Sequence, residues 1–255
     1  MKPEAGDQPT LEVLYEDNHL IAVCKPAGLL TQADQSGQPN LLDELKHWLA
    51  VRYAKPGNVF LGMLHRLDRP VTGVVLFAKT SKAASRLSEQ FRQRSVTKIY
   101  LARVHGVMRP AKGRLVHFHR HDEGERAVRL FDTPSANTKS ASLIYETRWV
   151  DHGESVLEVQ LETGRKHQIR AQLAQVGHPI LGDALYGSQR QHLGAAAKRR
   201  RPIISATVSA DAGPIPNARI SLCALQLTFE HPIHKAPVSV CLPAELVPPE
   251  LRSNS

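Results

Sequence analysis

Short apolar segments, some continuous and some alternating with polar residues, recur along this chain and limit it to folds with many β-strands. The expected strands lie at residues 20–24, 73–79, 98–104, 143–150, 155–161 and 222–229. Several of them follow one another with little sequence between them, as antiparallel neighbours do. We therefore expect an α+β fold with a mixed, largely antiparallel central sheet flanked by helices and loops.

Helices are expected at three places where apolar residues recur with helical spacing. The first begins after Asn40, whose side chain is a suitable N-cap, and the second begins after Thr80 or Ser81. The third covers residues 166–176, with Gly177 just beyond its C-terminal end. Strands outnumber helices in this prediction, which agrees with a sheet-centred fold.

The chain has 255 residues, a suitable length for one large domain, and shows no internal repeat. We expect a single domain over residues 11–247, with a frayed N-terminus at 1–10 and a tail at 248–255. Residues 188–219 lack periodicity and contain the basic run Lys198–Arg201, so a surface loop is expected there.

The formal net charge of +9 suits a polyanionic partner such as a nucleic acid. No apolar run approaches the length of about 20 residues that a membrane span needs, and the N-terminus lacks the apolar core of a signal peptide. The three cysteines are far apart in the sequence, which favours a reducing compartment. We therefore expect a cytoplasmic protein that does not bind membranes.

Asp68 lies in the densest polar cluster within an apolar context, residues 65–70. Arg66 and Arg69 flank it, and nearby cations favour the ionised form of a carboxyl group. Such a carboxylate can act as a nucleophile, a general base or a metal ligand. A purely structural Arg–Asp turn explains the same spacing equally well.

A second basic cluster covers residues 163–170 at a predicted strand-to-helix junction. Helix N-termini attract anions, so Arg165 and Lys166 could bind a phosphate or carboxylate there. The alternative is a solvated basic first turn. No glycine-rich phosphate-binding motif occurs in the chain.

His117, His119 and His121 alternate along the chain, so on a strand they would share one face and could bind Zn²⁺. Basic residues crowd this region and no acidic partner for the histidines is recognisable. We therefore favour a solvated strand or loop edge and predict no metal site.

Residues 65–73, His-Arg-Leu-Asp-Arg-Pro-Val-Thr-Gly, resemble the HRLDxxTSG signature of the RluA-type pseudouridine synthases. Further segments resemble that family's motifs in the same order, at residues 23–28, 98–106, 163–170 and 177–183. The chain departs from the pattern at Cys24, Thr72 and Gln172, where the family commonly has Asn, Ser and His. We expect no S4-like RNA-binding module before the catalytic domain.

The resemblance implies that a specific uridine in structured RNA is isomerised to pseudouridine without metal or cofactor. It implies a catalytic carboxylate at Asp68 paired with Arg165, Tyr100 against the target base, and Arg66 in place of the extruded nucleotide. The residues expected to bind the substrate are Lys25, Arg69, Lys98, Lys166, His167, Gln168 and Arg170.

The partner implied by the resemblance is tRNA or ribosomal RNA, bound by a monomer. Two other functions remain open at this point. One is a catalytically silent RNA-binding protein of the same fold, and the other is a metal-dependent hydrolase that uses the histidine run.

Overall fold

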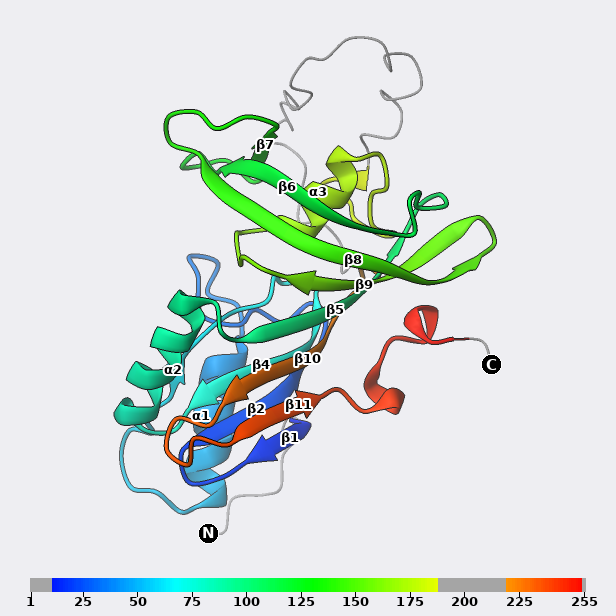
Figure 1. Ribbon diagram of the computed structural model, residues 1–255. Helices are drawn as coiled ribbons and strands as arrows, with labels where there is room; N and C mark the ends of the chain where they lie inside the picture. Colours follow the sequence, from blue (N-terminus) through cyan, green and yellow to red (C-terminus); the bar gives the residue numbers. More distant parts are fainter. Residues whose placement is uncertain (1–10, 188–218, 254–255) are drawn as a thin grey trace. The chain divides into compact units, whose positions relative to one another are not determined.

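The computed structural model describes residues 11–187 and 219–253, which belong to two compact units (Figure 1). Unit 1 comprises Met1–Val96 and Gln226–Leu246, and unit 2 comprises Thr97–Leu225 and Val247–Ser255. The expected frayed N-terminus and the basic run Lys198–Arg201 lie outside the described residues. No helix in the described ranges is long and apolar enough to cross a membrane.

The central strands of unit 1 are β2 (Leu20–Lys25) and β4 (Thr72–Ala78), and both are almost entirely buried. They pair antiparallel from Leu20 opposite Ala78 to Lys25 opposite Gly73. The remaining strands of this unit are β1 (Val13–Glu16) on β2, β3 (Gly62–Met63) on β4, and β11 (Pro237–Cys241), which pairs with the part of β10 (Leu222–Glu230) that begins at Gln226 and belongs to this unit. The register of β2 and β4 brings the turn that follows Lys25 beside the segment that precedes Gly73.

Two helices belong to unit 1, and both begin at the expected caps. The side chain of Asn40 accepts a hydrogen bond from the amide of Asp43 at the start of α1 (Leu41–Arg52). Thr80 does the same for Ala83 at the start of α2 (Ser81–Gln93). These caps confirm the two predicted helix starts. The short 3₁₀ helix η2 (Ala244–Leu246) also belongs to unit 1.

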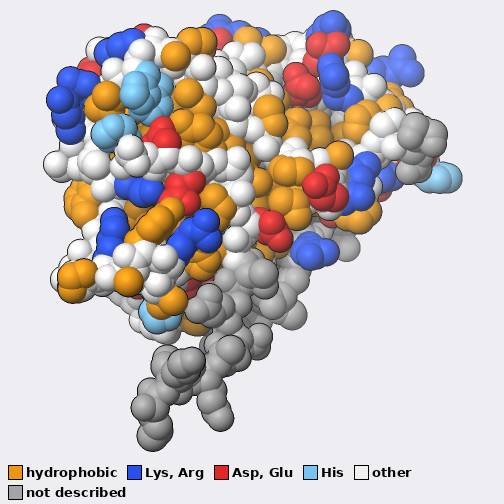
Figure 2. All heavy atoms as spheres, turned by 90° about the horizontal axis from the view of Figure 1, so that it is seen from below, with side chains coloured by type: hydrophobic (Ala, Val, Ile, Leu, Met, Phe, Trp, Pro, Cys, Tyr) orange, Lys and Arg blue, Asp and Glu red, His pale blue; other side chains and the backbone are white. Residues whose placement is uncertain are grey.

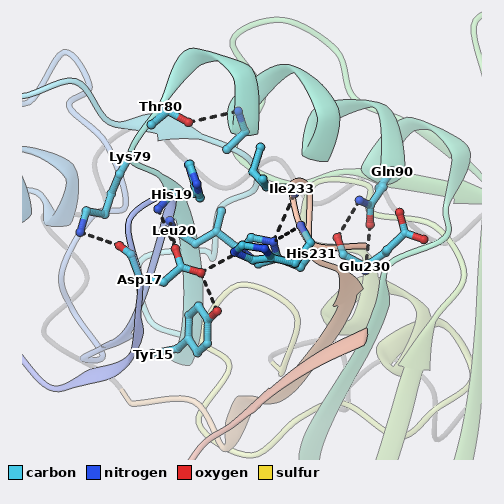
Figure 3. A network of polar contacts seen from close by, with 12 residues as sticks. Tyr15, Asp17, His19, Leu20, Lys79, Thr80, Gln90, Glu230, His231 and Ile233 are labelled. Carbon is cyan, nitrogen blue, oxygen red and sulfur yellow. Dashed lines mark hydrogen bonds and ion pairs between the residues drawn. The ribbon is translucent and has the colours of Figure 1, made fainter. Parts of the chain in front are cut away.

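A polar network fixes the turn between β1 and β2 to the turn between β10 and β11 (Figure 3). Asp17 accepts hydrogen bonds from the Tyr15 hydroxyl at 2.6 Å and from Nε2 of the buried His231 at 2.8 Å. Nδ1 of His231 in turn accepts the amides of Ile233 and His234. Burial opposes ionisation of Asp17. The hydrogen bonds from Tyr15 and His231, together with two from backbone amides, outweigh burial and lower the pKa of Asp17 to about 2.

Unit 2 contains a long antiparallel sheet in the order β5-β9-β8-β6-β7. Its strands are β5 (Thr97–Val104), β6 (Lys112–Arg120), β7 (Arg129–Phe131), β8 (Lys139–Asp151) and β9 (Glu154–Leu161). The helix α3 (Gln168–Gln175) contributes Ala171 and Ala174 to a buried cluster with Val128, Leu130 and Tyr186. The predicted antiparallel α+β fold is confirmed.

Some boundaries differ from the prediction for local reasons. The helix expected from residue 166 begins at Gln168, because His167 has the left-handed φ of 53° and ends the preceding turn. The expected tail at 248–255 contains the 3₁₀ helix η3 (Pro249–Leu251), whose Leu251 is fully buried. That part of the chain therefore contributes to the core of unit 2.

Candidate active site

Asp68 lies in the turn between β3 and β4 and is half-buried. The residue before it is held at both main-chain groups by Thr31, whose hydroxyl donates to the Leu67 carbonyl at 2.9 Å and accepts from the Leu67 amide at 3.2 Å. The amide of Val71 donates to the Asp68 carbonyl at 3.0 Å and closes the turn. The backbone that carries the carboxylate is therefore fixed on both sides.

Lys25 lies completely buried at the end of β2, beside this turn. Its ammonium donates to the carbonyls of Pro26 at 2.9 Å, Leu29 at 2.7 Å and Arg69 at 3.1 Å. Burial lowers the pKa of Lys25 to about 7, against the attraction of Asp68. Lys25 was expected to contact phosphates, and this expectation is wrong because a fully buried ammonium cannot reach RNA. It joins two turns and places a cation near Asp68.

The two arginines of the motif are exposed. Arg69 is nevertheless fixed, because its Nε donates to the Gly28 carbonyl at 2.9 Å while its carbonyl accepts the Gly28 amide at 2.8 Å. Gly28 has a φ of 90°, which other residues rarely adopt. The hydroxyl of Thr72 donates to the Lys25 carbonyl at 2.9 Å, a bond that the family's usual Ser could also form.

Tyr100 and Lys98 lie on β5 of unit 2, where Tyr100 is half-buried and pairs with Val159 of β9. Lys98 reaches the turn before α3, since a Cβ added to Gly164 would lie 3.6 Å from its Nζ. In the same turn, Arg165 donates from Nε to the Ser140 carbonyl at 3.1 Å. Nζ of Lys166 lies 2.8 Å from Nε2 of His121. The structure thus groups Lys98, Arg165 and Lys166 around one turn.

Buried glutamines support this turn from inside. Oε1 of Gln168 accepts hydrogen bonds from the Thr163 hydroxyl at 2.7 Å and from the Arg165 amide at 3.0 Å. Nε2 of Gln168 donates to Oε1 of Gln172, which is also fully buried, at 3.0 Å. The expectation that Gln168 binds substrate is wrong because these contacts and its burial direct it inward. It orients Arg165 instead.

Arg170 is buried in a two-point ion pair with Asp183, with distances of 2.7 and 2.9 Å. Its guanidinium also lies 5.3 Å from the ring centre of Tyr186. The expected phosphate contact of Arg170 is therefore also wrong, because the guanidinium has a buried carboxylate partner. His167 is half-buried, and its Nδ1 lies 3.0 Å from the Tyr186 hydroxyl.

The first two histidines of the alternating run are buried on β6, which corrects the expectation of a solvated edge. Nδ1 of His117 accepts from Gln172 at 3.0 Å, and Nε2 of His119 donates to the Lys166 carbonyl at 3.0 Å. Burial lowers the pKa of both imidazoles. Among the described residues, no group of three or more His, Cys, Asp or Glu side chains is arranged to hold a metal ion. These histidines support the turn that carries Arg165.

Sequence reasoning missed Thr31 and Asp183, which hold the two turns in place. Thr31 carries no signal of its own, because its partner Leu67 is distant in the sequence. Asp183 lies in the segment 177–183 that resembles the family, but its pairing with Arg170 could not be deduced from spacing.

Comparison with known proteins shows the family of this chain. Residues 19–175 match the family model described as RNA pseudouridylate synthase. The ribosomal large subunit pseudouridine synthase D of Xylella fastidiosa is 33% identical over 235 residues, which cover 91% of this chain and 66% of that protein. The tRNA pseudouridine synthase C of Haemophilus ducreyi is 33% identical over 196 residues, which cover 71% of this chain and 76% of that protein.

A solved structure has the same fold. Human RNA Pseudouridylate Synthase Domain Containing 4 superimposes with a TM-score of 0.68 at 25% identity, covering 94% of this chain and 90% of that one. The motif around Asp68, the fold and the match over residues 19–175 agree with one another. The chain therefore belongs to the RNA pseudouridylate synthase family, in its RluA-type branch, and is an isomerase that acts on RNA.

Proposed function

We propose that this synthase isomerises a specific uridine in a structured tRNA or ribosomal RNA, with Asp68 as its catalytic carboxylate. The observation that carries the proposal is the fixation of the Asp68 turn by Thr31 and Lys25 within the motif at residues 65–73. Similar relatives are named for tRNA and for ribosomal RNA at equal identity, so both RNA classes belong in the test.

In the reaction, the bond between C1′ of the ribose and N1 of the uracil breaks, and C1′ then bonds to C5 of the same base. Asp68 acts either as the nucleophile at C1′ or as the base that removes a sugar proton, and both roles need an ionised carboxylate. The buried ammonium of Lys25 attracts that charge from within the same unit. We expect the reaction to need neither metal nor cofactor.

The basic turn of unit 2 supplies the other groups of the proposed mechanism. Arg165 pairs with Asp68, and Tyr100 lies against the target base and assists proton transfer at C5. Arg66, which is exposed, occupies the place that the flipped nucleotide leaves. We expect the enzyme to act as a monomer in the cytoplasm.

The proposed phosphate contacts are the cationic side chains that remain accessible, Arg69, Lys98 and Lys166. His167, half-buried beside Lys166, completes this group. Lys25, Gln168 and Arg170 are buried and are not among the proposed phosphate contacts. Phosphate contacts add affinity that falls with salt and carry no sequence information.

Replacement of Asp68 by Asn tests the catalytic assignment. The side chain keeps its size but loses its charge, so pseudouridine formation should fall to background while RNA remains bound. Substrates are tRNA and ribosomal RNA from a strain that lacks the gene, and tritium release from C5-labelled uridine measures the reaction. Asp43→Asn, an exposed carboxylate of the same unit, is the matched control and should retain activity. An active Asp68→Asn enzyme would refute the mechanism.

A further inference from the structure

A stretch of unit 1 that precedes the catalytic motif contains no acidic residue. Residues 45–67 have neither Asp nor Glu but four Lys or Arg residues, Lys46, Arg52, Lys55 and Arg66. This stretch ends at the residue before Asp68. In the structure, the end of α1 lies at the far end of the β2–β4 pair from Asp68, because Tyr53 contacts Glu16 and Lys79 beside the Leu20–Ala78 end. An RNA whose target uridine lies at Asp68 would reach this end with a flanking segment.

The same stretch exposes large hydrophobic side chains. Val51, Tyr53 and Phe60 are each about half exposed, at 50%, 45% and 51%. Exposed aromatic rings beside cations are typical of surfaces that bind single-stranded nucleic acids, because each base can stack on a ring while the cations contact phosphates. Figure 2 shows that Lys, Arg, Asp and Glu side chains lie among hydrophobic ones on the face that it presents.

Cations surround the ring of Tyr53 at the C-terminal end of α1. The guanidinium carbon of Arg52 and Nζ of Lys55 each lie 5.8 Å from the ring centre, and Nζ of Lys79 lies 5.3 Å from it. Arg52 also lies 4.9 Å from the ring centre of Trp48. Two aromatic rings and several cations thus form one continuous cluster.

The carboxylate of Glu16 already has hydrogen-bond partners within this cluster. Glu16 accepts hydrogen bonds from the Tyr53 hydroxyl at 2.8 Å and from Lys79 at 2.6 Å, and its side chain is only 16% exposed. It therefore balances Lys79 and fixes the hydroxyl edge of the ring. The more exposed cations, Arg52 and Lys55, leave the outer surface of the cluster positive.

We propose that Trp48, Arg52, Tyr53 and Lys55 form a second RNA-contacting surface that binds a single-stranded segment flanking the target uridine. A base stacks on Tyr53, while Arg52 and Lys55 contact the neighbouring phosphates. The inference rests on the proposed RNA substrate and deepens it. RNA is favoured over an anionic membrane because the positive charge accompanies aromatic rings on an enzyme whose substrate is itself RNA.

The structural alternative is that Arg52 only compensates the dipole at the end of α1 and that Tyr53 only binds Glu16. Two substitutions separate these roles. Tyr53→Phe keeps the ring but loses the hydrogen bond to Glu16, whereas Tyr53→Ala loses both. A stacking role predicts that binding of a 20-nucleotide oligouridylate weakens about 5-fold or more in Tyr53→Ala and less than 2-fold in Tyr53→Phe.

The charge of the surface is tested by the double variant Arg52→Gln/Lys55→Gln. If each side chain contacts one phosphate, the slope of log K against log salt should become shallower by roughly 1.4, about 0.7 for each contact. The matched control is Lys82→Gln/Lys235→Gln, which removes two exposed charges elsewhere in unit 1 and should leave the slope unchanged. Neither measurement depends on turnover.

In a Trp149→Phe background, Trp48 is the only tryptophan, and oligouridylate should quench its emission. With saturating substrate RNA, Tyr53→Ala should keep kcat and raise KM, as expected for a residue that binds but does not react. If the proposed function is wrong, the unmodified enzyme will form no pseudouridine in the test RNAs. The oligouridylate measurements do not depend on turnover and will still test this surface.

The inference is overturned if folded Tyr53→Ala binds oligouridylate as tightly as the unmodified protein. Equal weakening in Tyr53→Phe, or an unchanged salt slope in Arg52→Gln/Lys55→Gln, would also overturn it. The same holds if the surface binds vesicles of phosphatidylserine but not oligouridylate. Thermal unfolding of each variant verifies folding, and the charge variant decides the question if Tyr53→Ala does not fold.

Discussion

At the scale of single residues, the buried ammonium of Lys25 connects two turns that carry family motifs. Replacement by Met leaves the carbonyls of Pro26, Leu29 and Arg69 without their donor, so the free energy of unfolding should fall by roughly 2–4 kcal/mol. Catalysis should fall as well, because Arg69 follows Asp68 directly. Urea unfolding and single-turnover rates measure the two effects.

The pH dependence of this variant follows from the titration of Lys25. Its pKa is about 7 in the folded protein and near 10.5 in the unfolded chain, so between these values the unfolded chain binds more protons. The unmodified protein should therefore gain stability relative to Lys25→Met as the pH rises from 7 to 10. A constant difference between the two proteins over that range would contradict the assignment.

Asp17 has the opposite dependence on pH. Its pKa is about 2 in the folded protein, below the ordinary 3.8, so it stabilises the fold above pH 4 and loses this contribution as the pH falls toward 2. The contribution is at most about 2 kcal/mol, since the side chain is 25% exposed and solvent screens the interaction. Urea unfolding of Asp17→Asn should show this deficit at pH 7 and almost none at pH 2.

At the scale of elements, α3 carries the buried cation Arg170, and the turn before it carries the accessible cation Lys166. Arg170→Ala leaves Asp183 as an unpaired buried charge, so the free energy of unfolding should fall by roughly 3–5 kcal/mol. Lys166→Ala should change stability little but make the RNA salt slope shallower by roughly 0.7. Below its unfolding temperature, Arg170→Ala should keep the salt slope of the unmodified protein, and a shallower slope would restore Arg170 as a phosphate contact.

The elements also indicate what the sequence alone could predict. Apolar runs predicted β2 and β4, and polar caps predicted the starts of α1 and α2, because these signals are local. The region of β6 was expected to be a solvated strand or loop edge, but His117 and His119 occupy its buried positions. Polar residues were assumed to face solvent unless a partner was visible nearby in the sequence.

The same limit applies to the candidate site. The motif pointed to Asp68 as the proposed catalytic residue because its neighbours in the sequence are also its neighbours in the turn. The roles of Lys25 and Arg170 were misassigned, since the Leu29 and Arg69 carbonyls and Asp183 become their partners only through folding. Long-range pairing of polar groups, rather than residue type, decides which cations remain available to RNA.

At the scale of the whole molecule, the net charge of +9 should make RNA binding strongly dependent on salt. The run Lys198–Arg201 contributes four of the positive charges and lies outside the described residues. Its replacement by four alanines should weaken the affinity for substrate RNA and make the salt slope shallower. The rate at saturating RNA should stay nearly unchanged, because the proposed reacting groups are Asp68, Tyr100 and Arg165.

The salt dependence of binding and the rate at saturating RNA separate affinity from catalysis. Long-range attraction brings free enzyme and RNA together, so it no longer affects the rate once every enzyme molecule has bound RNA. Titration of substrate RNA at several salt concentrations gives the slope, and single-turnover rates at saturation give the chemical step. A collapse of the saturated rate in the four-alanine variant would mean that this run helps to assemble the catalytic site. In that case its contribution could not be purely electrostatic, and added salt would fail to reproduce the defect in the unmodified enzyme.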